Sequence, residues 1–248
     1  MHFGIKSIGV LFQVVMINHF NKKKIADLDV LEIPGDPDGK TILLLHGFGS
    51  NAMDLVPLHR IFQEKLKPNW LFPMAPFNVS GIPSNKGRAW FPVNLSTLQT
   101  AFEKKDLKTV ENAFPKDLTE FRECIECLVG ELNIPRSKLI IGGFSQGAVL
   151  SVDVALNGTE SVAAILIFSG TLIYESMWRS LSHQHTKTLF FQSHGTHDPL
   201  LPLEKAAELA SLLQDGGLKG KLHMFEGGHE IPQSILFQLN LFLKSLVN

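Results

Sequence analysis

The sequence predicts an α/β fold in which a mostly parallel β-sheet is covered by helices on both faces. Short β-rich runs alternate along the chain with stretches of helical spacing, and this alternation is typical of parallel sheets built from right-handed crossovers. Several strand-like runs are almost entirely apolar, for example Thr41–His46 and Lys138–Gly143. A strand carries apolar side chains in both directions when both faces of its sheet are buried.

The expected elements follow one another in a regular order. Strands are expected at Leu28–Ile33, Thr41–His46, Trp70–Met74, Lys138–Gly143, Ala163–Phe168, Thr188–His194 and Lys221–Phe225. Helices are expected at Met53–Leu66, Lys116–Leu132, Gln146–Leu156, Leu203–Leu213 and Ile231–Leu246. No internal repeat or interdomain linker interrupts this order. We therefore expect one domain over residues 26–248, preceded by an extension over residues 1–25.

One segment, residues 77–115, breaks the alternation of strands and helices. Gly or Pro stands at Gly81, Pro83, Gly87, Pro92 and Pro115. Long irregular insertions in compact domains are usually binding loops or lids. The exposed-looking aromatics Trp90 and Phe91 lie in its middle, and bulky rings beside prolines can form the rigid wall of a pocket. We expect a lid or pocket segment in which Trp90 and Phe91 contact the ligand.

Composition argues against several classes of protein. Hydrophobic residues make up 44% of the chain and charged residues 19%, a balance typical of a folded domain. The formal net charge is -1 and no basic stripe could neutralise phosphates, so a nucleic-acid partner is not expected. The short run Lys22–Lys24 is interpreted as a solvated loop.

The start of the chain resembles a signal peptide in part. Ile8–Ile17 is apolar except for Gly9 and Gln13 and follows Lys6, but no cleavage site of small residues comes after it. It is also shorter than the ~20 apolar residues that a membrane span needs. We interpret it as a strand or packing segment, or as sequence upstream of a true start at Met16. A cytoplasmic protein without stable membrane insertion is expected.

The two cysteines, Cys124 and Cys127, form a C-x-x-C pattern. A redox pair normally stands at a helix start directly after a strand. Here the surrounding apolar residues repeat every three or four positions, as on an amphipathic helix, so we interpret both cysteines as residues of a core helix. No second Cys or His pair follows at zinc spacing, and no metal site is expected.

The strongest local signal is the pentapeptide Gly143-Phe144-Ser145-Gln146-Gly147, which has the pattern G-x-S-x-G. It follows an apolar strand and precedes a helix, the context in which such a serine is a nucleophile on a sharp turn. The glycines are needed because a Cβ two residues away would crowd the serine. The turn exposes the hydroxyl of Ser145 and aims the backbone N–H of Gln146 at a reacting carbonyl oxygen.

A serine hydroxyl is a weak nucleophile and needs a base that is itself oriented by a carboxylate. Around such a turn the chain order is serine, acid, histidine. After Ser145, Asp198 and His229 each follow the end of an expected strand, where α/β sheets place functional groups. Ser145, Asp198 and His229 are therefore the predicted triad.

Other acids and histidines fit the triad less well. Asp153 lies inside an expected helix and is interpreted as a helix residue. His194 and His197 precede Asp198, which breaks the expected order. His183 and His185 stand in a polar stretch that is interpreted as a surface loop.

A second oxyanion donor is expected on the loop after an early strand. His46-Gly47-Phe48-Gly49 occupies such a loop, and its glycines let the backbone approach a ligand. We assign the backbone N–H groups of Phe48 and Gln146 as the two donors. The alternative is a glycine turn with a structural role alone.

Several motifs of this chain occur together and in a fixed order. They are His46-Gly47-Phe48-Gly49, Ala75-Pro76, Ala89-Trp90-Phe91, Gly143–Ala148, Ser193-His194-Gly195, Asp198-Pro199, Pro202 and Gly228–Ile231. In this combination the chain resembles the phospholipase/carboxylesterase family of the α/β-hydrolase fold, which includes the acyl-protein thioesterases, over roughly residues 30–245. The resemblance implies ester or thioester hydrolysis by a Ser-Asp-His triad without metal or organic cofactor. The family usually has Asp where Pro92 stands, and the poorly matching segment 77–115 is the region that shapes its acyl-binding groove.

We therefore predict a serine carboxylesterase that acts on small to medium acyl esters or thioesters through an acyl-enzyme on Ser145. The alternative is a lysophospholipase or acyl-protein thioesterase that takes long acyl chains from a lipid or an acylated protein. A non-catalytic binding protein of the same fold would be marked by loss of the triad, and all three residues are present. A lactone hydrolase of the dienelactone type would have Cys in place of Ser145.

Overall fold

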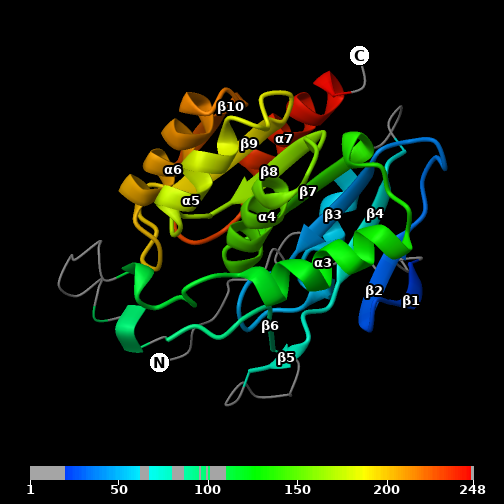
Figure 1. Ribbon diagram of the computed structural model, residues 1–248, viewed down its shortest axis with the longest axis horizontal. Helices are drawn as coiled ribbons and strands as arrows, with labels where there is room; N and C mark the ends of the chain where they lie inside the picture. Colours follow the sequence, from blue (N-terminus) through cyan, green and yellow to red (C-terminus); the bar gives the residue numbers. More distant parts are fainter. Residues whose placement is uncertain are drawn as a thin grey trace.

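The computed structural model describes residues 20–61, 67–79, 87–94, 96–98, 100 and 110–246 of the chain. The main strands are β1 (Asn21–Ile25), β2 (Leu28–Ile33), β3 (Thr41–Leu45), β4 (Asn69–Pro73), β7 (Leu139–Phe144), β8 (Ala164–Phe168), β9 (Leu189–Gly195) and β10 (Lys219–Phe225). They form one sheet in the order β1-β2-β4-β3-β7-β8-β9-β10 (Figure 1). From β4 to β10 all neighbours in that order are parallel, whereas β2 is antiparallel to both β4 and β1. The predicted mostly parallel sheet is confirmed.

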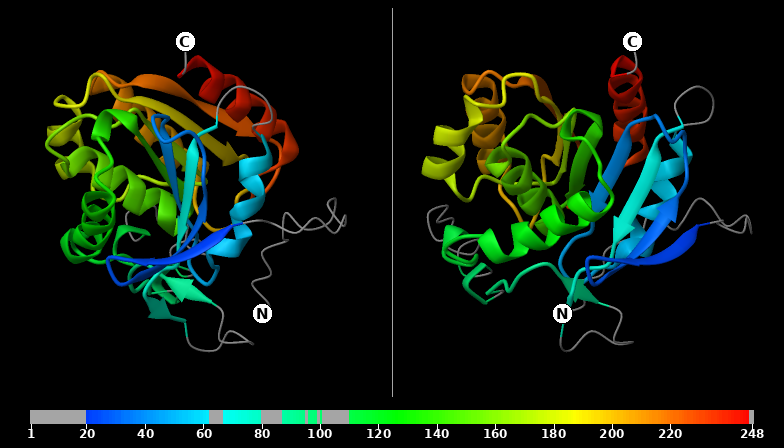
Figure 2. Two further views of the ribbon diagram at one scale, coloured as in Figure 1. Left: turned by 90° about the vertical axis from the view of Figure 1, so that its right-hand side faces the viewer. Right: turned by 45° about the vertical axis from the view of Figure 1, so that its right-hand side comes forward.

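Helices cover both faces of this sheet (Figure 2). One face carries α3 (Thr119–Glu131), α4 (Gln146–Asn157), α5 (Glu175–Ser182) and α6 (Leu203–Asp215). The other face carries α7 (Gln233–Ser245) and the 3-10 turns η2 (Ala52–Asp54) and η3 (Val56–Ile61). A further 3-10 turn, η4 (Arg136–Lys138), leads into β7. None of the helices in the described ranges is long and apolar enough to cross a membrane.

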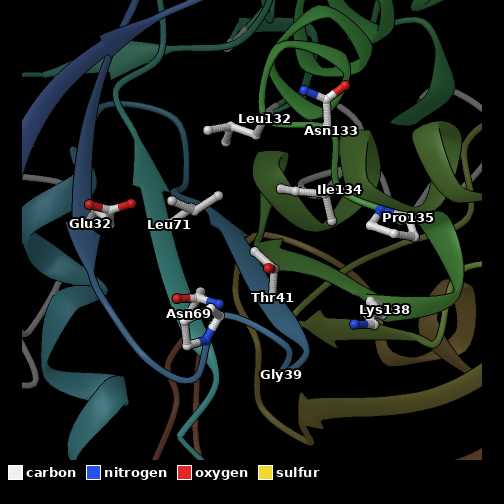
Figure 3. Close-up of a pocket in the computed structure, with 11 residues that line it drawn as sticks. Glu32, Gly39, Thr41, Asn69, Leu71, Leu132, Asn133, Ile134, Pro135 and Lys138 are labelled. Atoms are coloured by element: carbon white, nitrogen blue, oxygen red, sulfur yellow. The ribbon is translucent and has the colours of Figure 1, made fainter.

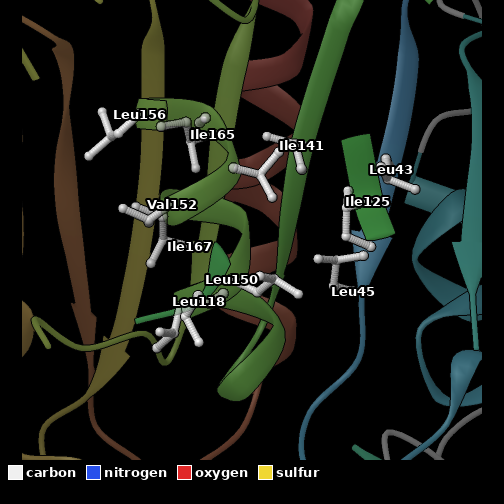
Figure 4. Close-up of a cluster of buried hydrophobic side chains, with 14 of the residues drawn as sticks. Leu43, Leu45, Leu118, Ile125, Ile141, Leu150, Val152, Leu156, Ile165 and Ile167 are labelled. Atoms are coloured by element: carbon white, nitrogen blue, oxygen red, sulfur yellow. The ribbon is translucent and has the colours of Figure 1, made fainter. Parts of the chain in front are cut away.

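The core consists of two apolar layers, one on each face of the sheet. On β3, Leu43 and Leu45 belong to the layer under α3–α6, whereas Ile42 and Leu44 belong to the layer under α7. Figure 4 shows the first layer, where side chains of α3 and α4 pack against those of β3, β7 and β8. The central strands β3, β7 and β8 are almost entirely apolar because both of their faces are buried.

The sheet begins earlier in the chain than the sequence pattern predicts. β1 pairs with β2 in a register that places Asn21 opposite Glu32 and Ile25 opposite Leu28. The interpretation of Lys22–Lys24 as a loop is therefore wrong. These lysines lie on an exposed edge strand, where charged side chains discourage pairing with another sheet, and Lys23 Nζ lies 2.8 Å from the Glu32 carboxylate.

Several helical expectations also change. The helix α5 is not among the expected elements, although its apolar residues Met177, Trp178 and Leu181 have helical spacing. Just after it, His185 is buried and its Nε2 lies 2.9 Å from the carbonyl oxygen of Leu156, so its interpretation as a surface residue is wrong. The helix expected at Met53–Leu66 is replaced up to Ile61 by η2 and η3. Residues 62–66 and the apolar stretch at 8–17 lie outside the described residues.

The cysteine pair lies on α3, within the helix that the apolar spacing predicts. Cys124 is half-buried against the core, whereas Cys127 is exposed. Burial raises the pKa of the Cys124 thiol, which keeps it protonated and poorly nucleophilic.

Candidate active site

Ser145 occupies the turn between β7 and α4. Its φ of 54° lies in the left-handed region, which a residue with a Cβ rarely adopts. A Cβ added to Gly143 would lie 2.5 Å from the backbone of Gly147, and one added to Gly147 would collide with the carbonyl oxygen of Leu45. The chain can make this strained turn only with glycine at both positions. The geometry is that of a nucleophile turn at the carboxyl end of a parallel strand.

Asp198 and His229 lie on loops that follow β9 and β10, which are neighbours in the sheet. His229 Nδ1 lies 2.6 Å from Asp198 Oδ2. The other carboxylate oxygen, Oδ1, accepts the backbone N–H groups of Leu200 at 2.8 Å and Leu201 at 2.9 Å. Burial alone would raise the pKa of Asp198, but the hydrogen bond and charge of His229 and the two N–H groups hold it below its ordinary value. Asp198 is therefore a carboxylate that accepts the Nδ1–H of His229.

The ring of His229 lies beside the turn that carries Ser145. Its centroid is 4.7 Å from that of Phe144, the residue before the serine. The His229 side chain is 10% exposed, whereas that of Asp198 is 1% exposed. With Nδ1–H donated to Asp198, Nε2 is the ring nitrogen left to accept a proton. The arrangement is suited to a base whose orientation is set by a buried acid.

A second histidine touches the same carboxylate. His194 Nε2 lies 2.9 Å from the carbonyl oxygen of Leu201 and 3.4 Å from Asp198 Oδ2. Its side chain is fully buried, and burial lowers its pKa, so the ring is neutral near pH 7. The chain-order argument excluded His194 as a base, but it did not reveal this supporting position. The signal in the sequence that could have revealed it is that His194 stands four residues before Asp198.

The turn after β3 lies directly against the serine. A Cβ added to Gly47 would lie 3.5 Å from the Cβ of Ser145. Phe48 follows in this turn, and Gln146 is the first residue of α4. The N–H of a first helical residue has no acceptor within its own helix. The structure thus brings the segments of both expected oxyanion donors to Ser145.

Trp90 and Phe91 do not form an exposed wall. Both side chains are buried, at 1% and 0% exposure, so neither ring presents an exposed surface to a substrate, and their contact with substrate stays a prediction. The Gly- and Pro-rich surroundings suggested an open loop, but the rings pack inward. The Trp90 ring lies 5.3 Å from that of His46, and the Phe91 ring 5.7 Å from that of Phe121 on α3.

The described part of the chain contains at least two hollows. The larger, about 440 Å³, is an open groove lined by Pro92, Val93, Asn94, Asn112, Ala113, Phe114 and Pro115. It begins one residue after Phe91, whose carbonyl oxygen lies 2.7 Å from Gln146 Nε2. The smaller, about 210 Å³, lies between the first residues of β3 and β4, Thr41 and Asn69, at the end of the sheet away from Ser145 (Figure 3). Ser145, Asp198 and His229 line neither of these two hollows. The described residues contain no cluster of three His, Cys, Asp or Glu that could hold a metal.

Known proteins are similar to this chain over most of its length. A family model described as Phospholipase/Carboxylesterase matches residues 26–247. A protein named acyl-protein thioesterase 1 from Eremothecium gossypii is 30% identical over 218 residues, covering 84% of this chain and 88% of its own. One of the same name from Debaryomyces hansenii is 28% identical, covering 77% and 84%. The crystal structure of esterase PE8 is 25% identical with a TM-score of 0.67 and covers 88% of this chain and 99% of its own.

Proposed function

This chain belongs to the phospholipase/carboxylesterase family, and from that premise we propose that it hydrolyses esters or thioesters of small to medium acyl groups through an acyl-enzyme on Ser145. The observation that carries the proposal is the 2.6 Å contact between His229 and Asp198 beside the strained turn of Ser145. A nucleophile, a base and an orienting acid are thereby gathered at one edge of the sheet.

The proposed chemistry uses these groups in two half-reactions. In the first, Ser145 Oγ attacks the acyl carbonyl carbon while His229 Nε2 takes its proton. The oxyanion of the tetrahedral intermediate accepts the backbone N–H groups of Phe48 and Gln146, and its collapse expels an alcohol or thiol that receives the proton from His229. In the second half-reaction, His229 takes a proton from a water molecule as the water attacks the acyl-enzyme. The proton then passes to Ser145 Oγ as the carboxylic acid is released.

The groove that begins at Pro92 is the proposed site for the acyl chain. Val93, Ala113 and Phe114 provide apolar surface, and each methylene removed from water contributes about 0.8 kcal/mol. The second candidate is a long-chain lysophospholipase or acyl-protein thioesterase acting on a lipid or an acylated protein, which the printed names of the fungal relatives favour. A cytoplasmic location is part of the proposal.

The decisive test replaces the nucleophile. Ser145→Ala should reduce ester hydrolysis by about 10⁴-fold or more, because the hydroxyl forms the covalent intermediate. A fluorophosphonate probe should label the wild type and not this variant, while Ser180→Ala, at an exposed serine of α5, should label normally. Labelling of Ser145→Ala at another serine would overturn the assignment.

A further inference from the structure

We propose that the segment Arg88–Phe91, called the strap below, is a positioning element that holds the two oxyanion donors in register with each other. The inference rests on the proposed function and names residues that act on the reaction through Phe48 and Gln146. The strap crosses between the turn after β3 and the start of α4, and it is bonded to both.

On one side, the strap brackets Phe48. The backbone N–H of Gly49 donates to the carbonyl oxygen of Arg88 at 2.8 Å, and the N–H of Arg88 donates to that of Ser50 at 2.8 Å. Trp90 Nε1–H donates to the carbonyl oxygen of His46 at 2.9 Å. Residues before and after Phe48 are thus fixed to one rigid segment.

On the other side, the strap is held by the side chain of Gln146. Its Nε2–H donates to the carbonyl oxygen of Phe91 at 2.7 Å, and its Oε1 accepts the backbone N–H of Trp90 at 2.9 Å. The amide therefore pairs with the strap as a neighbouring strand would. Only an amide side chain offers a donor and an acceptor in this arrangement. The residue that provides one oxyanion donor is itself locked by the strap.

The contacts between the strap and the site are buried. Gln146 is 3% exposed and Trp90 is 1% exposed, so water cannot replace a lost hydrogen bond at low cost. His46 is held as well, since its Nδ1–H donates to the carbonyl oxygen of Gly47 at 2.8 Å and its Nε2 accepts the N–H of Ala75 at 3.1 Å. Hydrogen bonds of the strap therefore connect the segments that carry the two oxyanion donors.

The geometry of the donors matters more for the transition state than for substrate binding. Oxyanion donors act when they lie about 2.7–3.1 Å from the position of the developing charge. A relaxed strap would let Phe48 and Gln146 drift apart by a fraction of an ångström. Such a change weakens stabilisation of the oxyanion while leaving the acyl groove in place.

The test uses a matched pair of tryptophans. Trp90 and Trp178 are both buried, and each indole N–H makes one hydrogen bond of 2.9 Å, to His46 O and to Asp153 Oδ1 respectively. Each Trp→Phe change keeps a ring and removes that bond. Trp90→Phe should lower kcat about 10-fold or more and leave KM within about 2-fold of the wild-type value. Trp178→Phe should lower the Tm and leave kcat unchanged.

A second readout reports the oxyanion directly. The Ki of an alkyl trifluoromethyl ketone, whose adduct with Ser145 carries an oxyanion, should rise in Trp90→Phe by the same factor as kcat falls. Gln146→Met keeps the backbone N–H and loses both side-chain hydrogen bonds, so it should change kcat and Ki as Trp90→Phe does. It replaces Trp90→Phe in the test if that variant does not fold. Unchanged kcat and Ki in a folded Trp90→Phe or Gln146→Met would overturn the inference. Failure of fluorophosphonate to label Ser145 in the wild type would instead overturn the proposed function.

Discussion

His229 Nδ1 lies 2.6 Å from Oδ2 of Asp198, and on its other side this oxygen lies 3.4 Å from Nε2 of His194. The two imidazoles have different surroundings. His229 is partly exposed on the loop after β10, whereas His194 is enclosed within β9 and bonded to the carbonyl oxygen of Leu201. We therefore expect His229, and not His194, to exchange a proton with a bound substrate. His194 contacts the Asp198 carboxylate from within the sheet.

This difference predicts a graded effect of three histidine substitutions. His229→Ala should reduce kcat/KM about as much as Ser145→Ala, and the double variant should lose little more, because the residues act as one unit. His197→Ala, at an exposed position, should stay within about 2-fold of wild type. His194→Ala should fall between them, since it leaves Asp198 without its buried neighbour. Steady-state kinetics on folded variants will decide, and loss of turnover in His197→Ala would contradict the assignment of the base.

The stability of the protein should fall with acid because of His46. Burial lowers the pKa of this ring to about 4, from 6.5. The unfolded chain therefore binds a proton between these values and the folded chain does not, so stability is complete above pH 6.5 and declines as the pH falls towards 4. The loss attributable to His46 is about 3 kcal/mol at pH 4.

Chemical unfolding across this pH range tests the contribution of His46. His46→Gln should be less stable at pH 7 but should lose less stability between pH 6.5 and 4. His197→Gln, at an exposed position, should keep the slope of the wild type. Equal slopes for His46→Gln and the wild type would show that folding does not lower the pKa of His46.

A buried ion pair links α3 to α4. Asp153, which is fully buried, lies with Oδ2 at 2.6 Å from Arg122 Nη1 and accepts the indole N–H of Trp178 from α5 through Oδ1. Asp153→Asn should cost about 3 kcal/mol of unfolding free energy, because it leaves a partly buried guanidinium without its partner.

An exposed ion pair provides the control for Asp153. Glu175→Gln disrupts the surface pair between Glu175 and Arg179, whose side chains are about half exposed, and should leave the free energy of unfolding almost unchanged. Both variants should retain kcat, since neither residue touches the site. Urea unfolding measures the difference, and similar costs for the two changes would refute a special role for Asp153.

The proposed acyl groove at Pro92–Pro115 predicts which acyl-chain lengths the protein hydrolyses best. We expect kcat/KM to rise from acetyl to about hexanoyl or octanoyl esters and then to level or fall, because further methylenes gain no buried surface. Val93→Asp should reduce octanoyl hydrolysis more than acetyl hydrolysis, while Asn94→Asp, on the exposed rim, should affect both alike. A steady rise to palmitoyl esters would favour the long-chain deacylase alternative.

The parallel sheet, the turn of Ser145 and the position of Asp198 and His229 after strand ends could all be predicted from the sequence. Each of these depends on local patterns. Apolar runs such as Thr41–Leu45 report strands buried on both faces, and the glycines around Ser145 report a turn that tolerates no Cβ. The positions of Asp198 and His229 followed because parallel strands end at the same edge of the sheet.

The side chains that meet across that edge are known only from the folded structure. Trp90 and Gln146 are 56 residues apart, and no periodicity in either segment reveals that one holds the other. The same is true of the burial of Phe91, of Asp153 beneath α5, and of β1 joining the sheet. A sequence pattern reports how each segment is buried on its own. Contacts between distant segments depend on how those segments pack, and packing is settled only when the whole core is assembled.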